Sequence, residues 1–369
     1  MECNAIKIRN FRNIAEAEIA FDSGVNILVG DNAQGKTNLL EAISFTALGK
    51  SFRTTHEEEM IRFGEEFSEI SLDFTDSVRR QNITVRMMKG QRRRIEHNHV
   101  KVTKLSDIVG AFRTVLFCPE HLSLIKEGPS ERRNYLDIAI SQLYPLYLKS
   151  LQRYHQILKQ RNQLIRRAED DYKTFSDTIE FWTSQLAHEA AIIAKYRVRY
   201  LKKAEEHIRR CFGEMTGERE LPSAVYVGSS HKEPDFYEDT EAAEKDYFEM
   251  LMSHHDREIG AGSTLWGIHK DDIEIQINGK ATRAFASQGQ QRSLALSMKL
   301  AEGEVCAEIC GEKPVFLFDD VFSELDGSRR AYLSSKMADR QVIITTCEPS
   351  GIAGGKLIRV ENGNYCNIE

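Results

Sequence analysis

Residues 30–37 form a glycine-rich run that can bind phosphate. Their sequence, GDNAQGKT, matches the pattern G-x-x-x-x-G-K-[ST], follows an apolar strand and precedes a helix. Glycines let backbone N–H groups curl around phosphates, and a helix start favours an anion. The run therefore predicts a nucleoside-triphosphate site, with Lys36 on the outer phosphates and Thr37 on Mg²⁺. Its candidate contacts are Gly30, Asp31, Asn32, Ala33, Gln34, Gly35, Lys36 and Thr37.

A second chemical signal is a pair of carboxylates that follows the apolar run 315–318. A triphosphate site of this kind needs an acidic residue at the end of a neighbouring strand. We expect Asp319 to hold Mg²⁺ and Asp320 to polarise the attacking water as general base. Because Asp is one methylene shorter than Glu, we predict slow hydrolysis of a kind that suits a switch.

The string SQGQQR at residues 287–292 begins a predicted helix and allows two interpretations. Ser287 with Gln290 fits a capping box, a purely structural motif. A serine and a glycine at a helix N-terminus can also donate to the γ-phosphate of a nucleotide held by a second subunit. The residues alone leave both interpretations open.

The elements that must position these groups lie far apart in the chain. Alternating and apolar runs predict strands at 3–11, 67–74, 83–88, 273–277, 315–318 and 341–346, and residues 21–29 predict a turn that leads into a buried apolar strand. Helical periodicity predicts a helix at 37–48, a long antiparallel pair at 145–167 and 176–211, and another helix at 290–310. Lys36 and Asp319 are 283 residues apart, so a large insertion divides the site.

The expected fold is α/β, a P-loop ATPase head with a mixed β sheet plus an inserted helical arm. We predict residues 1–130 as the N-terminal part of the head with a β lobe, 131–260 as the arm, and 261–369 as the C-terminal part of the head.

Composition excludes several classes of protein. With 41% hydrophobic and 29% charged residues, the chain of 369 residues has an ordinary globular composition rather than a disordered or collagen-like one. No apolar run reaches the ~18 residues of a membrane helix, and residues 1–9 lack the apolar block of a signal peptide. Seven cysteines without C-x-x-C spacing favour a reduced, cytoplasmic protein.

The charge of the chain is unevenly distributed. The net charge is −6, yet residues 131–211 contain 16 Lys and Arg against 10 Asp and Glu. Such a segment can present a basic surface to nucleic acid despite the acidic total.

The motifs together resemble a known family. Residues 6–13 (IKIRNFRN), the glycine-rich run, 287–292 and 319–326 resemble ABC-type ATPases of the SMC-like group. Further strings are similar to the bacterial RecF family of DNA replication and repair proteins; they lie at 48–54, 117–120, 128–133, 135–137, 154–162, 267–272 and 285–291. The resemblance runs nearly from end to end.

The resemblance implies an ABC/SMC head that binds ATP and Mg²⁺ and dimerises with both nucleotides between the subunits. By analogy, Arg12 and Asn13 lie near the base or ribose, and Glu120 belongs to the metal-sensing loop. Ser287, Gly289 and Gln290 are then expected to contact the partner's nucleotide. We expect weak, DNA-stimulated ATP hydrolysis.

The resemblance also implies DNA binding at duplex next to single-stranded gaps, and loading of RecA together with RecO and RecR. No zinc finger or helix-turn-helix is present in the sequence, so backbone contacts are expected. The candidate DNA contacts are basic residues of the predicted β lobe and arm: Arg92, Arg93, Arg94, Arg132, Arg133, Arg166 and Arg167. Arg53 is a candidate to couple DNA to the ATP site.

Three departures from the family pattern stand out. The string GIHKDD at 267–272 has Lys270 in place of an arginine, and so lacks a forked guanidinium. A hairpin usually closed by Asn-Gly has Asn98-His99. Cys347 follows a strand where a third threonine is common, and no histidine stands there. His269 is the candidate substitute for sensing γ-phosphate, or a hydrogen-bonded turn histidine.

Three other classes of protein would show different sequence features. Another SMC-like repair ATPase would carry a longer coiled coil or a nuclease domain. An ABC transporter subunit would show a shorter gap between its motifs, and a metabolic P-loop kinase would lack the Ser287 string. Gel filtration with and without ATP separates these alternatives from an ATP-dependent dimer that binds DNA.

Overall fold

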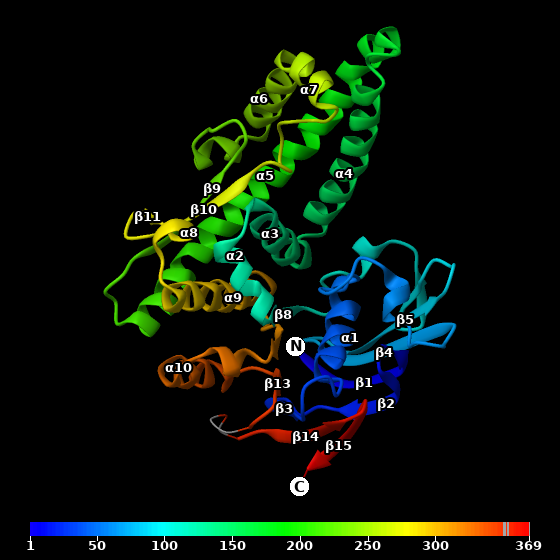
Figure 1. Cartoon of the computed structure of the whole chain (residues 1–369), viewed down its shortest axis with the longest axis vertical. Helices are drawn as coiled ribbons and strands as arrows, with labels where there is room; N and C mark the ends of the chain where they lie inside the picture. Colours follow the sequence, from blue (N-terminus) through cyan, green and yellow to red (C-terminus); the bar gives the residue numbers. More distant parts are fainter. Residues whose placement is uncertain (350–351, 353, 369) are drawn as a thin grey trace. The chain divides into compact units, whose positions relative to one another are not determined.

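The computed structural model describes residues 1–349, 352 and 354–368, and it divides into two compact units. Unit 1 comprises Met1–Leu122, Cys211–Glu218 and Arg292–Glu369, and unit 2 comprises Ser123–Arg210 and Arg219–Gln291. Unit 2 contains the predicted arm at 131–260 except for 211–218, and it extends beyond the arm to 123 and 291. Figure 1 follows the chain through both units.

Unit 1 contains an antiparallel sheet with the strand order β2-β1-β4-β5-β6-β7. Its strands are β1 (Glu2–Phe11), β2 (Ile14–Ala20), β4 (Phe67–Thr75), β5 (Arg80–Met88), β6 (Arg94–His97) and β7 (Val100–Val102). Buried and partly buried residues alternate along β4, as in a sheet with one face on the core. The turn at Asn98-His99 has positive φ at both residues (51° and 65°), so His99 adopts the backbone that glycine usually takes in such hairpins.

The second sheet of unit 1 has the order β15-β14-β3-β13-β12-β8 and is parallel except for its edge strand β15. The strands are β3 (Val25–Val29), β8 (Thr114–Phe117), β12 (Val315–Asp319), β13 (Val342–Thr346), β14 (Lys356–Glu361) and β15 (Asn364–Ile368). The central strands β12 and β13 are buried along their full length, which explains their nearly continuous apolar sequences. The sequence patterns did not predict β2, β8, β14 or β15.

Helix α1 (Lys36–Leu48) packs into the core between residues of both sheets. Leu39, Leu40 and Ile43 share one buried cluster with Ile6 of β1 and Leu317 of β12. Because almost every side of α1 is buried, its one acidic residue, Glu41, is buried as well and needs partners. The remaining helices of unit 1 are η1 (Glu57–Met60), η2 (Leu105–Asp107), η3 (Pro119–Leu122), η5 (Val321–Glu324), α10 (Gly327–Met337) and most of α9 (Gln288–Cys310).

Unit 2 is built mainly from helices. The predicted pair is present as α4 (Pro145–Arg166) and α5 (Tyr172–Thr216), and Arg161 Nε of α4 donates to Thr183 Oγ1 of α5 at 3.1 Å. A small antiparallel sheet has the order β11-β10-β9. The other elements are α2 (Ser123–Lys126), α3 (Pro129–Leu143), β9 (Pro222–Val227), η4 (Pro234–Glu238), α6 (Thr240–Ser253), α7 (His255–Ala261), β10 (Asp272–Ile277), β11 (Lys280–Ala281) and α8 (Thr282–Phe285).

Buried ion pairs hold unit 2 together. Arg161 and Glu258 are both fully buried, 2.7 Å apart. Arg197 donates to Asp137 at 2.9 Å and to the Ile268 carbonyl at 2.8 Å. These contacts join α4 to α7, and α5 to α3 and to the loop before β10. Within the described residues, no helix is both long and apolar enough to cross a membrane.

Candidate functional site

A cavity of about 440 Å³ opens in unit 1 at the carboxyl ends of the parallel strands. The glycine-rich run 30–37 follows β3, Asp319 ends β12, Thr345 lies near the end of β13, and Glu120 follows β8. This edge of a parallel sheet is where ligands bind in open α/β folds. The lining residues are Asn13, Asp31, Asn32, Ala33, Gly35, Lys36, Thr37, Asn38, Arg53, Pro119, Glu120, Asp319, Asp320 and Thr345. The structure thus brings the glycine-rich run and the paired carboxylates together.

The glycine-rich run needs glycine at both ends of the motif. Gly35 has a φ of 118°, which side-chain-bearing residues rarely adopt. A Cβ at Gly30 would lie 2.3 Å from the Val360 carbonyl oxygen of β14. Gln34 contacts Asn362 and Gly363 through its side chain and backbone rather than the cavity. The run is therefore held in shape by β14 and β15, at the end of the chain.

Lys36 is 6% exposed and lies under the loop. Its ammonium donates to the carbonyls of Gly30 and Asp31, and its Nζ is 3.5 Å from Cys347 Sγ. Among the residues that the structure describes, no carboxylate forms an ion pair with it. A phosphate group would supply the missing counter-charge, so the residues present fit a phosphate ligand.

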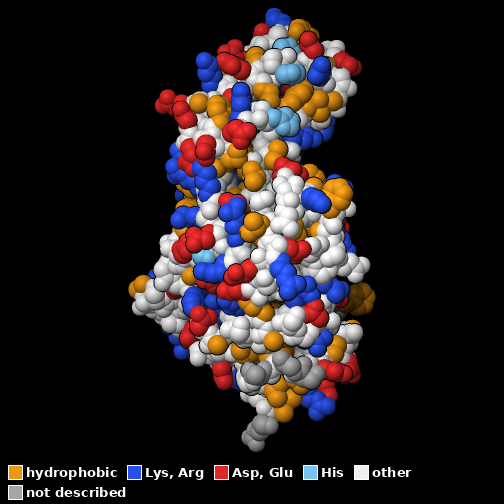
Figure 2. Space-filling view, turned by 90° about the vertical axis from the view of Figure 1, so that its left-hand side faces the viewer, with side chains coloured by type: hydrophobic (Ala, Val, Ile, Leu, Met, Phe, Trp, Pro, Cys, Tyr) orange, Lys and Arg blue, Asp and Glu red, His pale blue; other side chains and the backbone are white. Residues whose placement is uncertain are grey.

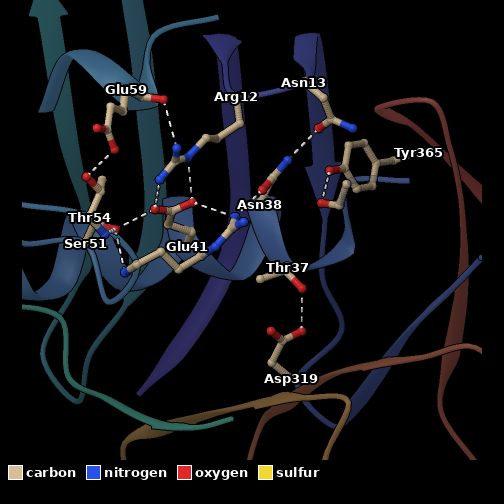
Figure 3. A network of polar contacts seen from close by, with 12 residues as sticks. Arg12, Asn13, Thr37, Asn38, Glu41, Ser51, Thr54, Glu59, Asp319 and Tyr365 are labelled. Atoms are coloured by element: carbon tan, nitrogen blue, oxygen red, sulfur yellow. Dashed lines mark hydrogen bonds and ion pairs between the residues drawn. The ribbon is translucent and has the colours of Figure 1, made fainter. Parts of the chain in front are cut away.

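Asp319 lies opposite the first turn of α1. Its Oδ1 accepts a hydrogen bond from Thr37 Oγ1 at 2.9 Å (Figure 3). It accepts a second one from Thr345 Oγ1 at 2.7 Å. Burial raises the pKa of Asp319, and the negative charges of Glu120 and Asp320 raise it further. A cation beside these three acidic groups would reverse that effect.

The oxygen atoms at this point suit Mg²⁺. This ion is usually held by one or two carboxylates together with substrate phosphates rather than by a complete protein cage. The described part of the chain contains no cluster of three or more His, Cys, Asp or Glu residues able to hold a metal. Thr37 and Asp319 would hold the ion with a bound phosphate.

The loop that carries Glu120 is fixed by His121. The Cys118 N–H donates to His121 Nδ1 at 3.1 Å, and the ring stacks on Phe117. Burial lowers the pKa of His121 well below its ordinary value, and the positive charge of Lys299 adds to the effect. A neutral imidazole therefore keeps Nδ1 free to accept this bond, which positions Glu120 at the cavity.

Arg12 and Asn13 have different surroundings. Asn13 lines the cavity, where its Oδ1 accepts from Asn38 Nδ2 at 2.8 Å. The Arg12 guanidinium instead pairs with the buried Glu41, through bonds of 2.9 and 2.7 Å (Figure 3). Arg12 is not among the residues that line the cavity. Its guanidinium pairs with the Glu41 carboxylate, which is buried and therefore needs a positive partner. Arg53, which contacts both Asn38 and Glu41, is the arginine that does line it.

The Ser287 string forms the predicted capping box. Ser287 N donates to Gln290 Oε1 at 2.7 Å, and Gln290 N donates to Ser287 Oγ at 3.3 Å. The side-chain amide of Gln290 also donates to Glu220. Ser287 is exposed at the start of α9, in unit 2, so its hydroxyl remains accessible to a ligand.

The candidate DNA contacts fall into two groups. Arg92, Arg94, Arg166 and Arg167 are exposed. Three others are held by contacts within their own unit. Arg93 donates to Glu57 and the Gly49 carbonyl and lies over the Phe45 ring. Arg132 is 6% exposed and bonds Asp272 at 2.6 and 2.9 Å, and Arg133 donates to the Asp271 carbonyl at 2.8 Å. The buried Arg132 guanidinium also donates to the carbonyls of Leu124 and Glu127, so its N–H groups are engaged within unit 2, and its contact with DNA stays a prediction.

The structure gives the surroundings of the residues at or near the departures from the family pattern: His269, Lys270 and Cys347. His269 is a hydrogen-bonded turn histidine, with Nδ1 2.7 Å from Tyr154 Oη and Nε2 3.1 Å from the Thr264 carbonyl. Burial lowers its pKa to about 4. Lys270 is exposed. Cys347 takes the place beside Lys36 and donates to Asn32 Oδ1 at 3.1 Å.

Sequence reasoning missed four residues of the site. Asn38, Pro119 and Thr345 line the cavity, and Tyr365 Oη of β15 donates to the Gly35 carbonyl at 2.9 Å (Figure 3). The position of Asn38, one residue after the motif, was a usable signal. Tyr365 follows the motif by more than three hundred residues, and no local pattern marks it.

Comparisons with known proteins agree with this geometry. Residues 3–362 match the family described as "RecF/RecN/SMC N terminal domain". The chain is 36% identical to the DNA replication and repair protein RecF of Clostridium tetani, over 97% of each chain. It is 38% identical to RecF of Listeria innocua, over 95% of this chain and 94% of the other.

Solved structures are similar as well. A structure of the recombination mediator protein RecF-ATPrS in the RecFOR pathway has a TM-score of 0.94 and 33% identity, and covers 100% of this chain and 98% of the other. A structure of RecF-ATP has a TM-score of 0.91 at 32% identity, with coverage of 100% and 99%. An Smc head bound to the C-terminal winged-helix domain of ScpA has a TM-score of 0.58 at 16% identity, with coverage of 100% and 97%. This last likeness concerns the fold alone.

Proposed function

The chain belongs to the RecF family of DNA replication and repair proteins, and on this premise we propose that it is an ATP-dependent DNA-binding protein of recombinational repair and replication restart. Two copies join when each binds ATP and Mg²⁺, and the dimer acts at gapped or junction DNA in the cytoplasm. With RecO and RecR it helps to load RecA. The relatives named as RecF-ATP in the RecFOR pathway support this proposal.

The observation that carries the proposal is the buried ammonium of Lys36. It lies beneath the cavity, 6% exposed, at the start of α1, and within the described residues its partners are the Gly30 and Asp31 carbonyls and Cys347 Sγ, with no carboxylate among them. A buried cation without an anionic partner is costly, and a triphosphate removes that cost. The ATP-free subunit is therefore expected to gain stability from nucleotide.

Each group of the cavity has a role in this proposal. Lys36 binds the outer phosphates, Thr37 and Asp319 hold Mg²⁺, and Asn13 contacts the ribose or base. Mg²⁺, when bound, neutralises phosphate charge. Asp320 accepts a proton from the attacking water, and its N–H is anchored on Thr345 Oγ1 at 2.9 Å. Glu120 senses the metal.

Dimerisation uses the exposed start of α9. Ser287, Gly289 and Gln290 donate to the nucleotide of the other subunit, because a helix N-terminus favours an anion. Hydrolysis removes the γ-phosphate and releases the contact. Slow turnover at Asp320 then makes the nucleotide a switch.

The test combines gel filtration and DNA binding. Wild-type protein is expected to elute as a dimer with ATP and Mg²⁺ and as a monomer without nucleotide, whereas Lys36→Ala remains a monomer in both conditions. Lys101→Ala, which removes an exposed lysine of β7, serves as the matched control and should dimerise like wild type.

Binding to gapped duplex is then measured across a salt series with and without ATP. ATP-dependent binding supports the proposal. A protein that stays monomeric under saturating ATP, or binds DNA equally well without it, would refute the proposal. A nucleotide-dependent dimer with no affinity for DNA would instead favour an ABC-type ATPase that does not act on DNA.

A further inference from the structure

Helix α4 has an unusual composition for a solvent-exposed helix. None of its 22 residues is Asp or Glu, whereas five are Lys or Arg, and four of these five are exposed because Arg161 is buried with Glu258. Its long partner α5 carries both signs, with the i,i+4 pair Arg209–Glu205 and the pair Arg199–Glu238. A solvated helix usually resembles α5, because pairs of opposite charge stabilise its surface. The one-sided charge of α4 therefore calls for an external partner.

The exposed side chains of α4 form one continuous face. Successive members are three or four residues apart, so they lie on the same side of the helix. We call this set, with the residue that caps the end of the helix, the α4 basic face: Lys149, Arg153, Gln156, Lys159, Gln163 and the capping Arg167. The opposite side, with Tyr147, Leu151, Tyr154 and Ile165, is buried in unit 2. The face spans about 27 Å at 1.5 Å per residue.

Three of the four basic groups on this face have no acidic partner among the described residues. Among the described residues, none of Lys149, Lys159 and Arg167 forms an ion pair. Arg153 is 3.5 Å from Glu189, whose side chain is buried while Arg153 remains 67% exposed. The amides of Gln156 and Gln163 add hydrogen-bond donors between the charges. The next acidic residues, Glu169 to Asp171, follow the helix.

We propose that the α4 basic face binds the phosphate backbone of duplex DNA, without reading its sequence. This rests on the proposed function, to which it adds the contact surface. Phosphates follow one another at ~3.4 Å along each strand, so the face covers about eight base-pair steps. DNA contacts end before the acidic segment 169–171. The surface differs from the separate arginines at 92, 94 and 166, and it includes Arg167.

The absence of apolar anchors distinguishes DNA from other anionic partners. A helix that lies on a membrane carries a row of large apolar residues opposite its charges at the interface. The large apolar residue that is strongly exposed on the described α4 is Leu146, in its first turn. Binding of single strands relies on exposed aromatic side chains, and the α4 basic face has none. Elsewhere, on the face that Figure 2 shows, side chains of both charges are interspersed.

The experiment neutralises the face without introducing acid. The triple variant Lys149→Gln, Lys159→Gln and Arg167→Gln keeps good helix formers and leaves the Arg153 contact intact. The matched control is Lys173→Gln, Lys203→Gln and Lys245→Gln, which removes three exposed lysines of α5 and α6. Both variants are compared with wild type by fluorescence anisotropy on a gapped duplex with ATP. Gel filtration with ATP accompanies each measurement.

The α4 variant is expected to bind DNA at least ~10-fold more weakly, and its log–log salt slope should fall by about 2.7, or ~0.9 for each lost phosphate contact. The control should change neither quantity. ATP-dependent dimerisation should be preserved. If the α4 variant dimerises and binds DNA as tightly as the control, the inference that the α4 basic face binds DNA is refuted, whereas the proposed function is not. Wild-type protein with no affinity for DNA overturns both.

A crosslink provides a second measurement that does not depend on how the triple variant folds. A photoreactive amino acid at Gln156 should crosslink to gapped duplex, and the same group at Lys203 on α5 should not. Crosslinking at Lys203 alone would overturn the inference. The inference would also be overturned if phosphatidylglycerol vesicles competed for this crosslink as effectively as unlabelled gapped duplex does.

Discussion

The ion pair between Arg12 and Glu41 offers a quantitative test of what holds the first helix beside the nucleotide cavity. Glu41 is completely buried in α1, and Arg12, in the turn between β1 and β2, is 18% exposed. Two charge-assisted hydrogen bonds join them, at 2.9 and 2.7 Å. Ser51 also donates to the carboxylate, and Arg53 lies 3.3 Å from it. A double-mutant cycle tests the pair by comparing wild type with Arg12→Gln, Glu41→Gln and the double substitution.

The expected losses follow from burial. Arg12→Gln leaves a buried carboxylate with Ser51 and Arg53. Because Arg53 is 43% exposed, its contribution is below about 1 kcal/mol. Removing one partner of a buried pair costs about 3–5 kcal/mol, and we expect about 3 here since part of the pairing remains. Glu41→Gln should cost about 2 kcal/mol, because the guanidinium keeps a neutral acceptor and reaches water.

The double substitution should cost about 3 kcal/mol rather than the ~5 of the two single changes, a coupling of about 2 kcal/mol. Urea unfolding followed by far-UV circular dichroism measures the free energy of unfolding. The control cycle is Lys7→Gln and Glu18→Gln, an exposed pair on β1 and β2 at 2.9 Å, whose coupling should stay below about 1 kcal/mol. Additivity within about 0.5 kcal/mol for Arg12 and Glu41 would refute the assignment of a buried, mutually dependent pair.

Three further predictions concern other residues. Arg132→Lys should destabilise unit 2 by about 1–2 kcal/mol in urea unfolding, because lysine cannot form both bonds to Asp272. The salt slope of DNA binding should not change in this variant. A reduced slope would contradict a buried structural role for Arg132. Burial lowers the pKa of His269 to about 4, so the unfolded state binds more protons below pH ~6.5, and stability should fall as pH drops from ~6.5 towards ~4. His269→Gln should flatten this part of the pH profile of unfolding, and an unchanged profile would count against it. Asp320→Asn should lower the ATP turnover at least ~100-fold while ATP-induced dimerisation persists; turnover near the wild-type rate would exclude Asp320 as general base.

Local chemistry was predictable from the sequence. The glycine-rich run, the apolar strand that ends at Asp319 and the capping box at Ser287 each need only neighbouring residues. The long helices at 145–167 and 176–211 are found as α4 and α5, since an uninterrupted apolar stripe specifies a helix almost by itself. The short strands β8 and β14 were not predicted: β8 has only four residues, and the charged residues of β14 interrupt its apolar ones.

The roles of individual charged side chains were not predictable in this way. Arg93, Arg132 and Arg133 looked like surface arginines, yet each binds a carboxylate or carbonyl from a distant segment. Arg12 belongs to Glu41 rather than to the cavity, and Tyr365 reaches the glycine-rich loop from the last strand. Motif and periodicity predicted the glycine-rich loop and the long helices, because backbone conformation depends on nearby residues. Only the tertiary structure decided which charged side chains remain available to bind a ligand, because a buried carboxylate pairs with the basic side chain that the fold places beside it.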